Sequence, residues 1–173
     1  QHKLDRILIV DWDVHHGNGT QDIFYDDPRV MFFSIHRYPF YPGTGAANET
    51  GTGRGLGFTR NEPVSFGTPR TEYRARFERA LTESASKIRP QLVLISAGFD
   101  AHAEDPIGSL GLEVDDFVSM TKSVIEIANS HCDGRIVSML EAGYKVHALA
   151  VSVAAHMHVL VEHARDDALS AKK

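Results

Sequence analysis

The chain has 173 residues, of which 42% are hydrophobic and 24% are charged, and its formal net charge is -5. This composition excludes disordered and fibrous proteins, and it suffices for one domain with a hydrophobic core. The acidic balance argues against nucleic-acid binding through bulk charge, and no apolar run reaches the ~20 residues of a membrane-spanning helix. The single cysteine, Cys132, cannot form an internal disulfide. We therefore expect it to be a buried apolar filler in a cytoplasmic protein.

Short runs rich in branched apolar residues predict the strands of a parallel sheet, because they are continuous rather than alternating. These runs are residues 7–10, 30–35, 92–95 and 136–140. Between and after them, apolar residues at three- to four-residue spacing predict helices over 73–88, 117–128 and about 146–161. The sequence therefore predicts an α/β fold with three α/β/α layers and a mainly parallel sheet. We expect this partial domain to span residues 1–165, followed by a polar tail at 166–173 whose last three residues are frayed.

The segment from 37 to 69 is rich in glycine and proline and has little periodicity. We expect it to be mostly loop, with a short strand starting near Phe58. Long loops inside a compact domain are commonly functional. Its aromatic cluster of Tyr38, Phe40 and Tyr41 predicts an ordered wall over a site.

Chemically reactive side chains follow the predicted strands. Ligands of open α/β sheets bind beyond the carboxyl ends of the strands, so these positions are the ones to inspect. The first strand leads into Asp11, Asp13 and His15, the third into Asp100, and the fourth into Tyr144. Because parallel strands end at the same edge, we expect these side chains to lie close together.

The two-residue spacing of Asp11, Asp13 and His15 would point all three to one side of an extended backbone. Two carboxylates and an imidazole desolvated together favour a shared cation. Zinc with an open position for water suits this donor set, although Fe(II), Co(II) or Mn(II) could use it too. Helix capping or a solvated loop would explain the triplet equally well, but Asp100 on a neighbouring strand favours the metal. We expect His102 to be a partly exposed loop residue or a hydrogen-bond donor around the site.

Tyr144 follows Gly143 directly after the fourth strand. A phenol held there can donate a hydrogen bond to a developing oxyanion, although a tyrosine that only caps the core is the more common outcome for such a residue in isolation. The remaining histidines have no convergent spacing, and we expect them to be solvated or on helix faces. They are His2, His131, His147, His156, His158 and His163.

Four motifs, in this order, resemble those of the histone deacetylase superfamily. They are DWDVHHGNGTQ from Asp11, SIH from Ser34 with YPGTG from Tyr41, SAGFD from Ser96, and LEAGY from Leu140. The first motif is most similar to the class II branch and its bacterial relatives, which include acetylpolyamine amidohydrolases and acetoin-utilisation proteins. The resemblance extends from about residue 7 to residue 160.

This resemblance implies zinc-dependent hydrolysis of an acetyl-amide, such as acetyl-lysine or an acetylpolyamine, to acetate and a free amine. It implies that Asp13, His15 and Asp100 bind zinc and that Tyr144 stabilises the tetrahedral intermediate. The implied substrate channel is lined by Tyr41, Gly98 and Ile107. A potassium ion is implied at Asp11, Asp13, His15, Ser34 and Ile35. A second potassium site is implied near Phe24, Asp27, Val30 and Phe58.

In the family, two catalytic histidines lie before the first of these motifs, and Asp11 and Asn18 would orient them. These 173 residues hold no counterpart of that pair, because His15 is needed for the metal and strand alternation directs His16 away. We therefore expect the chain to be the C-terminal portion of a longer deacetylase domain. The alternative is a metal-binding remnant or fragment without activity.

A binuclear manganese enzyme of the arginase type is a further alternative. It would require carboxylates where Gly17 and His102 stand, which makes it the weaker hypothesis. The expected partner is a small-molecule or peptide acetyl-amine, without nucleic acid or membrane, and a homo-oligomer is compatible with the composition.

Overall fold

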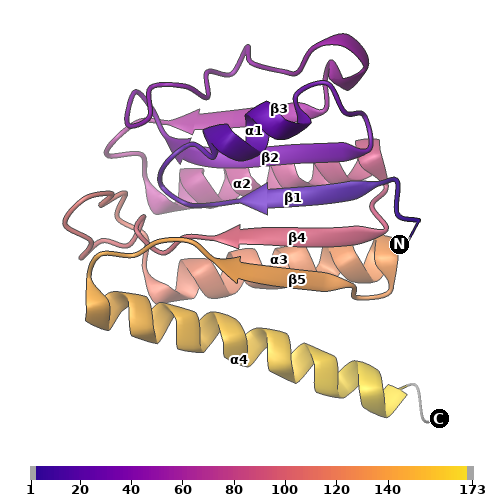
Figure 1. Ribbon diagram of the computed structural model, residues 1–173. Coiled ribbons are helices and arrows are strands. Elements are labelled where there is room, and N and C mark those ends of the chain that lie inside the picture. The colour runs from indigo at the N-terminus through magenta and orange to yellow at the C-terminus, as the bar shows by residue number, and fades with distance from the viewer. Residues whose placement is uncertain (1–2, 171–173) are drawn as a thin grey trace.

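The computed structural model describes residues 3–170, with side chains through residue 165. Within this range one parallel sheet of five strands runs in the order β3-β2-β1-β4-β5 (Figure 1). The α/β class and the parallel sheet are thereby confirmed. The strands are β1 (Ile7–Asp11), β2 (Val30–Arg37), β3 (Thr59–Val64), β4 (Leu92–Ala97) and β5 (Ile136–Leu140).

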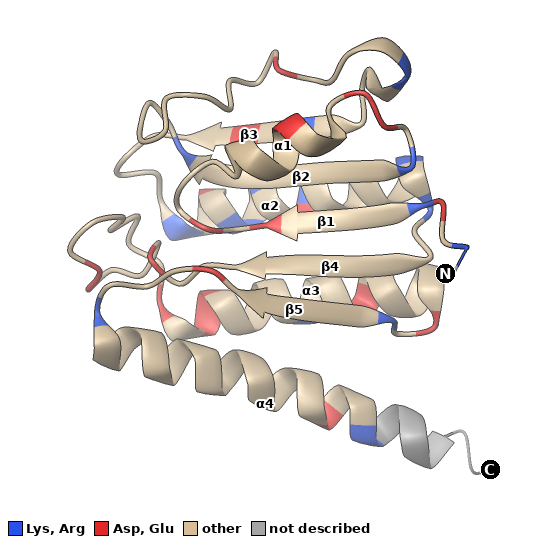
Figure 2. Ribbon diagram, in the orientation of Figure 1, with Lys and Arg blue, Asp and Glu red and all other residues tan. Residues whose placement is uncertain are grey.

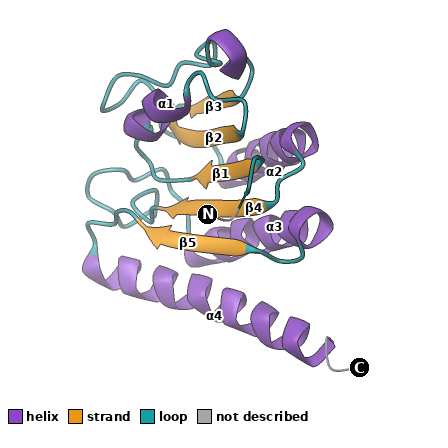
Figure 3. Cartoon of the chain, turned by 45° about the vertical axis from the view of Figure 1, so that its right-hand side comes forward, coloured by secondary structure: helices purple, strands orange, loops and turns teal. Residues whose placement is uncertain are grey.

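Helices lie on both faces of the sheet, in keeping with the predicted three layers, although among the described residues a single short helix lies on one of the faces. On one face lie α2 (Arg70–Ile88) and α3 (Val114–Cys132), while the short α1 (Asn18–Phe24) lies on the other face near β2 (Figures 1 and 3). The last helix, α4 (Val146–Ser170), packs along α3 beyond the β5 edge. None of the described helices is long and apolar enough to cross a membrane.

The main hydrophobic core lies between the sheet and the α2–α3 layer. Trp12 and Phe77 are fully buried there, and their rings meet edge to face with centroids 6.0 Å apart. Burial of each such side chain contributes roughly 1.5–3 kcal/mol to folding. Cys132 is free and buried in this core, as expected for a filler.

The segment from 37 to 69 contains more structure than its composition predicts. Besides a 3-10 turn at Gly53–Gly55, it holds the edge strand β3, which begins one residue after Phe58, near which a short strand is predicted. Two charged residues of β3, Arg60 and Glu62, face α2, where Arg60 pairs with Glu62 and Glu83, and Arg76 also pairs with Glu62. These ion pairs replace the apolar pattern by which a strand is recognised.

Two helices also differ from the prediction. The seven-residue α1 is short and has only Gln21 fully buried, so it has no apolar stripe to reveal it. Helix α4 continues to Ser170 instead of ending near residue 161, which makes the first part of the predicted polar tail helical. Residues 171–173, for which fraying is predicted, lie outside the described residues.

The strand register brings the reactive residues to one edge of the sheet. Asp11, the last residue of β1, is paired with Ser34 of β2 on one side and with Ser96 of β4 on the other. Acidic residues accordingly gather at the end of β1 and in the loops that follow β4 and β5 (Figure 2).

Candidate metal centre

Asp13, His15 and Asp100 form a compact group of potential metal ligands at the carboxyl ends of β1 and β4. One ligand atom from each residue lies within 4.8 Å of the other two. His15 Nδ1 is 2.9 Å from Asp13 Oδ1 and 3.1 Å from Asp100 Oδ2. Two carboxylate oxygens and one imidazole nitrogen are thus directed toward one point.

The backbone reaches this geometry by turning, which corrects the predicted extended segment. Strand β1 ends at Asp11, whose Oδ1 accepts the N–H of Asp13 at 3.0 Å. Asp13 Oδ1 in turn accepts the N–H of His15 at 2.8 Å. Aspartates commonly bond the backbone two residues on, and here two such turns follow each other. Asp11 is therefore outside the three-ligand group, although it is buried beside it.

Asp100 is tied to the same turn from the neighbouring strand. Its Oδ1 accepts the N–H of Val14 at 2.8 Å, and its side chain is fully buried. Oδ2 is also buried and accepts no hydrogen bond of good geometry. A buried carboxylate oxygen without a hydrogen bond is costly unless a cation compensates it.

The electrostatics of the group favour bound positive charge. Hydrogen bonding to Asp100, and then to Asp13, raises the pKa of His15 to about 9. Burial raises the pKa of Asp100, and burial together with the charge of Asp13 raises the pKa of Asp11. All three shifts arise where carboxylates are held close together out of water. The donor set, the Asp100 oxygen without a hydrogen bond of good geometry and the raised pKa values all fit a divalent metal such as zinc.

Aromatic rings form a wall beside His15, as the cluster at 38–41 predicts. The Phe40 ring stacks on the imidazole with centroids 5.3 Å apart, and Tyr41 meets it edge-on at 6.0 Å. Tyr144 approaches from the β5–α4 loop at 6.4 Å. Partial burial, and then the carboxylates of Asp100 and Asp13, raise the pKa of Tyr144, which keeps its phenol protonated as a hydrogen-bond donor.

The centre is open toward solvent on the side of the predicted channel. Tyr144 is 50% exposed, Tyr41 is 75% exposed and Ile107 is 44% exposed. Gly98 instead lies beneath the site, directly against Asp13. An adjoining hollow of about 290 Å³ is lined by both Asp11 and Asp13 and by Ala142.

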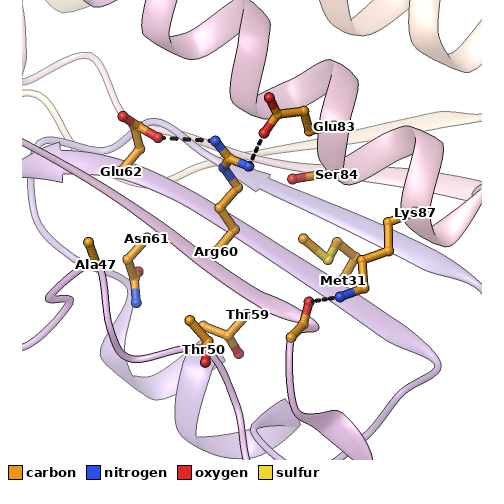
Figure 4. Close-up of a pocket in the computed structure, with 11 residues that line it drawn as sticks. Met31, Ala47, Thr50, Thr59, Arg60, Asn61, Glu62, Glu83, Ser84 and Lys87 are labelled. Atoms are coloured by element: carbon orange, nitrogen blue, oxygen red, sulfur yellow. Dashed lines mark hydrogen bonds and ion pairs between the residues drawn. The ribbon is translucent and has the colours of Figure 1, made fainter.

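A larger hollow of about 430 Å³ lies elsewhere, between β3, α2 and the loop before β3 (Figure 4). Its charged groups are engaged with their neighbours. Arg60 pairs with Glu62 and Glu83, and Lys87 donates to the carbonyl of Gly57 at 2.6 Å. Hence the chemistry resides at the strand ends and not in this larger hollow.

Two further histidines are buried in the structure. His102 is buried and stacks on Phe117, which corrects the expectation of partial exposure. His156 lies on a face of helix α4, as one of the two predicted outcomes requires, but that face is buried, 2.7 Å from Thr121 Oγ1 and 2.9 Å from Ser138 Oγ. His2 lies outside the described residues.

His16 points away from the metal group, in keeping with the reasoning that excludes it as a substitute base. Its Nδ1 shares a hydrogen bond with Thr44 Oγ1 at 2.8 Å, and its Nε2 shares one with Gln21 Oε1 at 3.0 Å. Asn18 is exposed at the start of α1.

Arg37 is a contributor to the site that has no signal in the sequence. Its guanidinium lies 4.3 Å from the centroid of Phe40 and 4.7 Å from that of Phe66, and it donates to the carbonyl of Gly108 at 3.3 Å. Arg37 thereby contacts the ring that stacks on His15. Only its position at the end of β2 could have drawn attention to it.

Comparison with known proteins identifies relatives of this chain. Residues 1–160 match the histone deacetylase domain family. A probable deacetylase from Archaeoglobus fulgidus is 46% identical over 143 residues, which are 83% of this chain and 40% of that protein. Histone deacetylase 10, chloroplastic, of Oryza sativa subsp. japonica is 42% identical over 89% of this chain and 35% of its own length.

Solved structures of related proteins are similar to this chain as well. The HDA15 HD domain superposes with a TM-score of 0.85 at 40% identity, over 91% of this chain and 44% of that chain. An acetylpolyamine aminohydrolase from Burkholderia pseudomallei superposes with a TM-score of 0.81 at 30% identity, over 90% of this chain and 45% of that chain. The chain therefore spans less than half the length of these relatives.

Proposed function

Because this chain belongs to the histone deacetylase family, we propose that it is the metal-binding portion of a domain that hydrolyses acetyl-amides in a zinc-dependent reaction. The observation that carries the proposal is the buried group of Asp13, His15 and Asp100 with Tyr144 beside it. The reaction converts the amide and one water molecule into acetate and a free amine.

Asp13, His15 and Asp100 would hold the metal through two carboxylate oxygens and one imidazole nitrogen. When bound there, zinc polarises the amide carbonyl and lowers the pKa of a bound water molecule, and Fe(II) could use the same donors. Three protein ligands leave a coordination position open, as in catalytic rather than structural zinc sites.

Tyr144 supplies the hydrogen bond to the carbonyl oxygen as negative charge develops on it. Its raised pKa keeps the donor proton in place at neutral pH. Removing one such donor commonly lowers turnover by about 10²- to 10³-fold. Tyr41 and Ile107, both exposed beside the centre, would guide the alkyl chain of the substrate. Gly98 lies directly against Asp13 and would hold this metal ligand in place.

The resemblance assigns proton transfer to a pair of histidines that these 173 residues do not contain. Asp11 and Asn18 would orient that pair. Activity is accordingly proposed for the whole domain. A chain that binds metal without turnover is the second candidate, favoured by the absence of that pair from the sequence.

Potassium is proposed as a structural cation beneath the zinc site, held by Asp11, Asp13, His15, Ser34 and Ile35. The direct pairing of Asp11 with Ser34 in the sheet supports this grouping. The second potassium site, near Phe24, Asp27, Val30 and Phe58, has weaker support. Three of its carbonyls, those of Phe24, Asp27 and Phe58, already accept backbone N–H groups.

The substrate class we propose is a small molecule or peptide that presents an acetylated amine, and a homo-oligomer stays compatible with it. Relatives bear the names of histone deacetylases and of an acetylpolyamine aminohydrolase, so both acetyl-lysine and acetylpolyamine belong to this class. A cytoplasmic location is proposed from the single buried cysteine, Cys132, which suits a reducing compartment.

A fluorogenic acetyl-lysine peptide tests the proposal. The whole zinc-loaded domain that contains this chain should release amine above the metal-free blank, and Tyr144→Phe should lower the rate by about 10²-fold. Tyr25→Phe, which removes a phenol remote from the centre, should leave the rate unchanged. Turnover of the whole domain no greater than the blank would favour the inactive metal-binding alternative.

A further inference from the structure

Asp105 joins the two loops that flank the candidate metal centre. It lies in the β4–α3 loop, five residues after Asp100, and is only 3% exposed. Its Oδ1 accepts the N–H groups of Ile107 at 2.9 Å and Gly108 at 3.0 Å. Its Oδ2 accepts the N–H of Tyr144 at 2.7 Å, across a separation of 39 residues.

This arrangement divides the two carboxylate oxygens between the two loops. Hydrogen bonds to an ionised group are roughly twice as strong as neutral ones, and three of them satisfy a carboxylate that is buried. The bond to Tyr144 reaches its backbone, so it sets where the residue stands while leaving the phenol free. Because the Tyr144 side chain is half exposed, packing alone constrains it little.

Other links between the loops hold neighbouring residues but not Tyr144 itself. Phe99 donates its N–H to the carbonyl of Ala142 at 2.6 Å, and Glu141 donates its N–H to the carbonyl of Ala97 at 3.1 Å. Both links lie before Gly143. Asp105 is thus the residue that links the β4–α3 loop to Tyr144 itself.

We propose that Asp105 is a positioning residue for Tyr144, acting through the Tyr144 backbone and at the same time fixing Ile107 on the facing wall. The inference rests on the proposed function, in which Tyr144 donates to the substrate oxygen. One carboxylate then sets the distance between the phenol and the channel wall. Misplacement of a catalytic group by about 1 Å can cost 10²-fold in rate.

Asp105→Asn is the informative substitution because it keeps the size of the side chain. An amide has one acceptor oxygen, and its NH2 group would face a backbone N–H. The single oxygen is expected on the side of Ile107 and Gly108, where it accepts two N–H groups, so the bond to Tyr144 is lost. The matched control is Glu104→Gln, which removes a charge from the same loop at an exposed side chain that makes no hydrogen bond or ion pair among the described residues.

The first measurement is amide hydrogen exchange by NMR, combined with zinc stoichiometry. In Asp105→Asn the Tyr144 amide should exchange at least about tenfold faster, corresponding to the loss of one hydrogen bond. Zinc binding should be retained in this variant, and Glu104→Gln should match the unmodified chain in both respects. An Asp105→Asn protein that is folded and still protects the Tyr144 amide overturns the inference.

Should Asp105→Asn fail to fold, the unmodified protein provides the same information. The amide of Tyr144 in that protein should exchange at least about tenfold more slowly than an amide without a hydrogen bond. A Tyr144 amide that exchanges as fast as an unbonded one would overturn the inference.

The second measurement is a double-mutant cycle on turnover of the acetyl-lysine peptide. Asp105→Asn should lower kcat by about tenfold or more with little change in KM. In the Tyr144→Phe background the same change should cost less than about twofold, because its effect passes through the phenol. Equal losses in both backgrounds would contradict the positioning role. If the whole domain with the unmodified chain shows no turnover, the proposed function fails, while the exchange measurement still decides the role of Asp105.

Discussion

Gly98 lies so close to Asp13 that no side chain fits between them. A Cβ atom at position 98 would overlap the Asp13 carboxylate and stand 2.5 Å from its Cα atom. Gly98, the residue after β4, is thereby packed directly against Asp13, which forms the candidate metal centre with His15 and Asp100. The requirement for glycine at this position comes from that contact and not from an unusual backbone angle.

Gly98→Ala should therefore displace Asp13 and weaken zinc binding by about 10- to 100-fold, the range seen when the support of a metal ligand is removed. Isothermal titration with zinc measures the effect. Gly19→Ala is the matched control, because a Cβ there meets no atom within 4 Å. Unchanged zinc affinity in Gly98→Ala would show that Asp13 does not depend on this contact.

Zinc binding should depend on pH through His15. Its hydrogen bonds to Asp100 and Asp13 raise its pKa to about 9 in the metal-free centre, so the imidazole carries a proton at pH 7.5. A metal needs the neutral ring and must displace that proton. Affinity should rise roughly tenfold per pH unit until pH approaches 9 and then level off. Calorimetry at pH 7.5 in buffers of different ionisation enthalpy should report about one proton released, and no release would contradict the assignment.

His156 should make folding stability sensitive to acid. Burial lowers its pKa to about 4, below the ordinary value of 6.5. The buried ring therefore contributes stability above pH 6.5, and this contribution is lost as pH falls toward 4, because only the unfolded state takes up the proton. Between pH 7.5 and pH 5 the loss is on the order of 2 kcal/mol from this residue.

Urea unfolding at the two pH values measures that loss. His156→Gln should start less stable at pH 7.5, since contacts with Thr121 and Ser138 are altered, but should lose about 2 kcal/mol less on acidification. His147→Gln, at an exposed position of the same helix, should behave like the unmodified chain. An identical acid sensitivity in His156→Gln would mean that another group is responsible.

The central strands were predictable because burial on both faces leaves a continuous apolar run, as in β1 from Ile7. The edge strand β3 has a different pattern: Arg60 and Glu62 are accommodated by ion pairs with each other and with α2. Such pairs depend on residues distant in the sequence. The sequence therefore indicated where this strand starts, near Phe58, but not its length or its pairing with α2.

The same distinction holds within the candidate site. Asp13, His15 and Asp100 could be grouped because each follows a strand, and parallel strands end at a common edge. Asp105 lies in the middle of a loop, and its meaning comes from a bond to Tyr144, 39 residues away. The burial of His156 likewise depends on how α4 packs on α3, which residue spacing alone does not specify.

The most direct test of the account is the zinc stoichiometry of Asp100→Ala and His102→Ala, measured after equilibrium dialysis of folded protein. The unmodified chain should bind one zinc ion, and His102→Ala should retain it, because His102 stacks on Phe117 away from the ligand group. Asp100→Ala should bind none. A full equivalent of zinc in Asp100→Ala, or an equal loss in the two variants, would contradict a centre built from Asp13, His15 and Asp100.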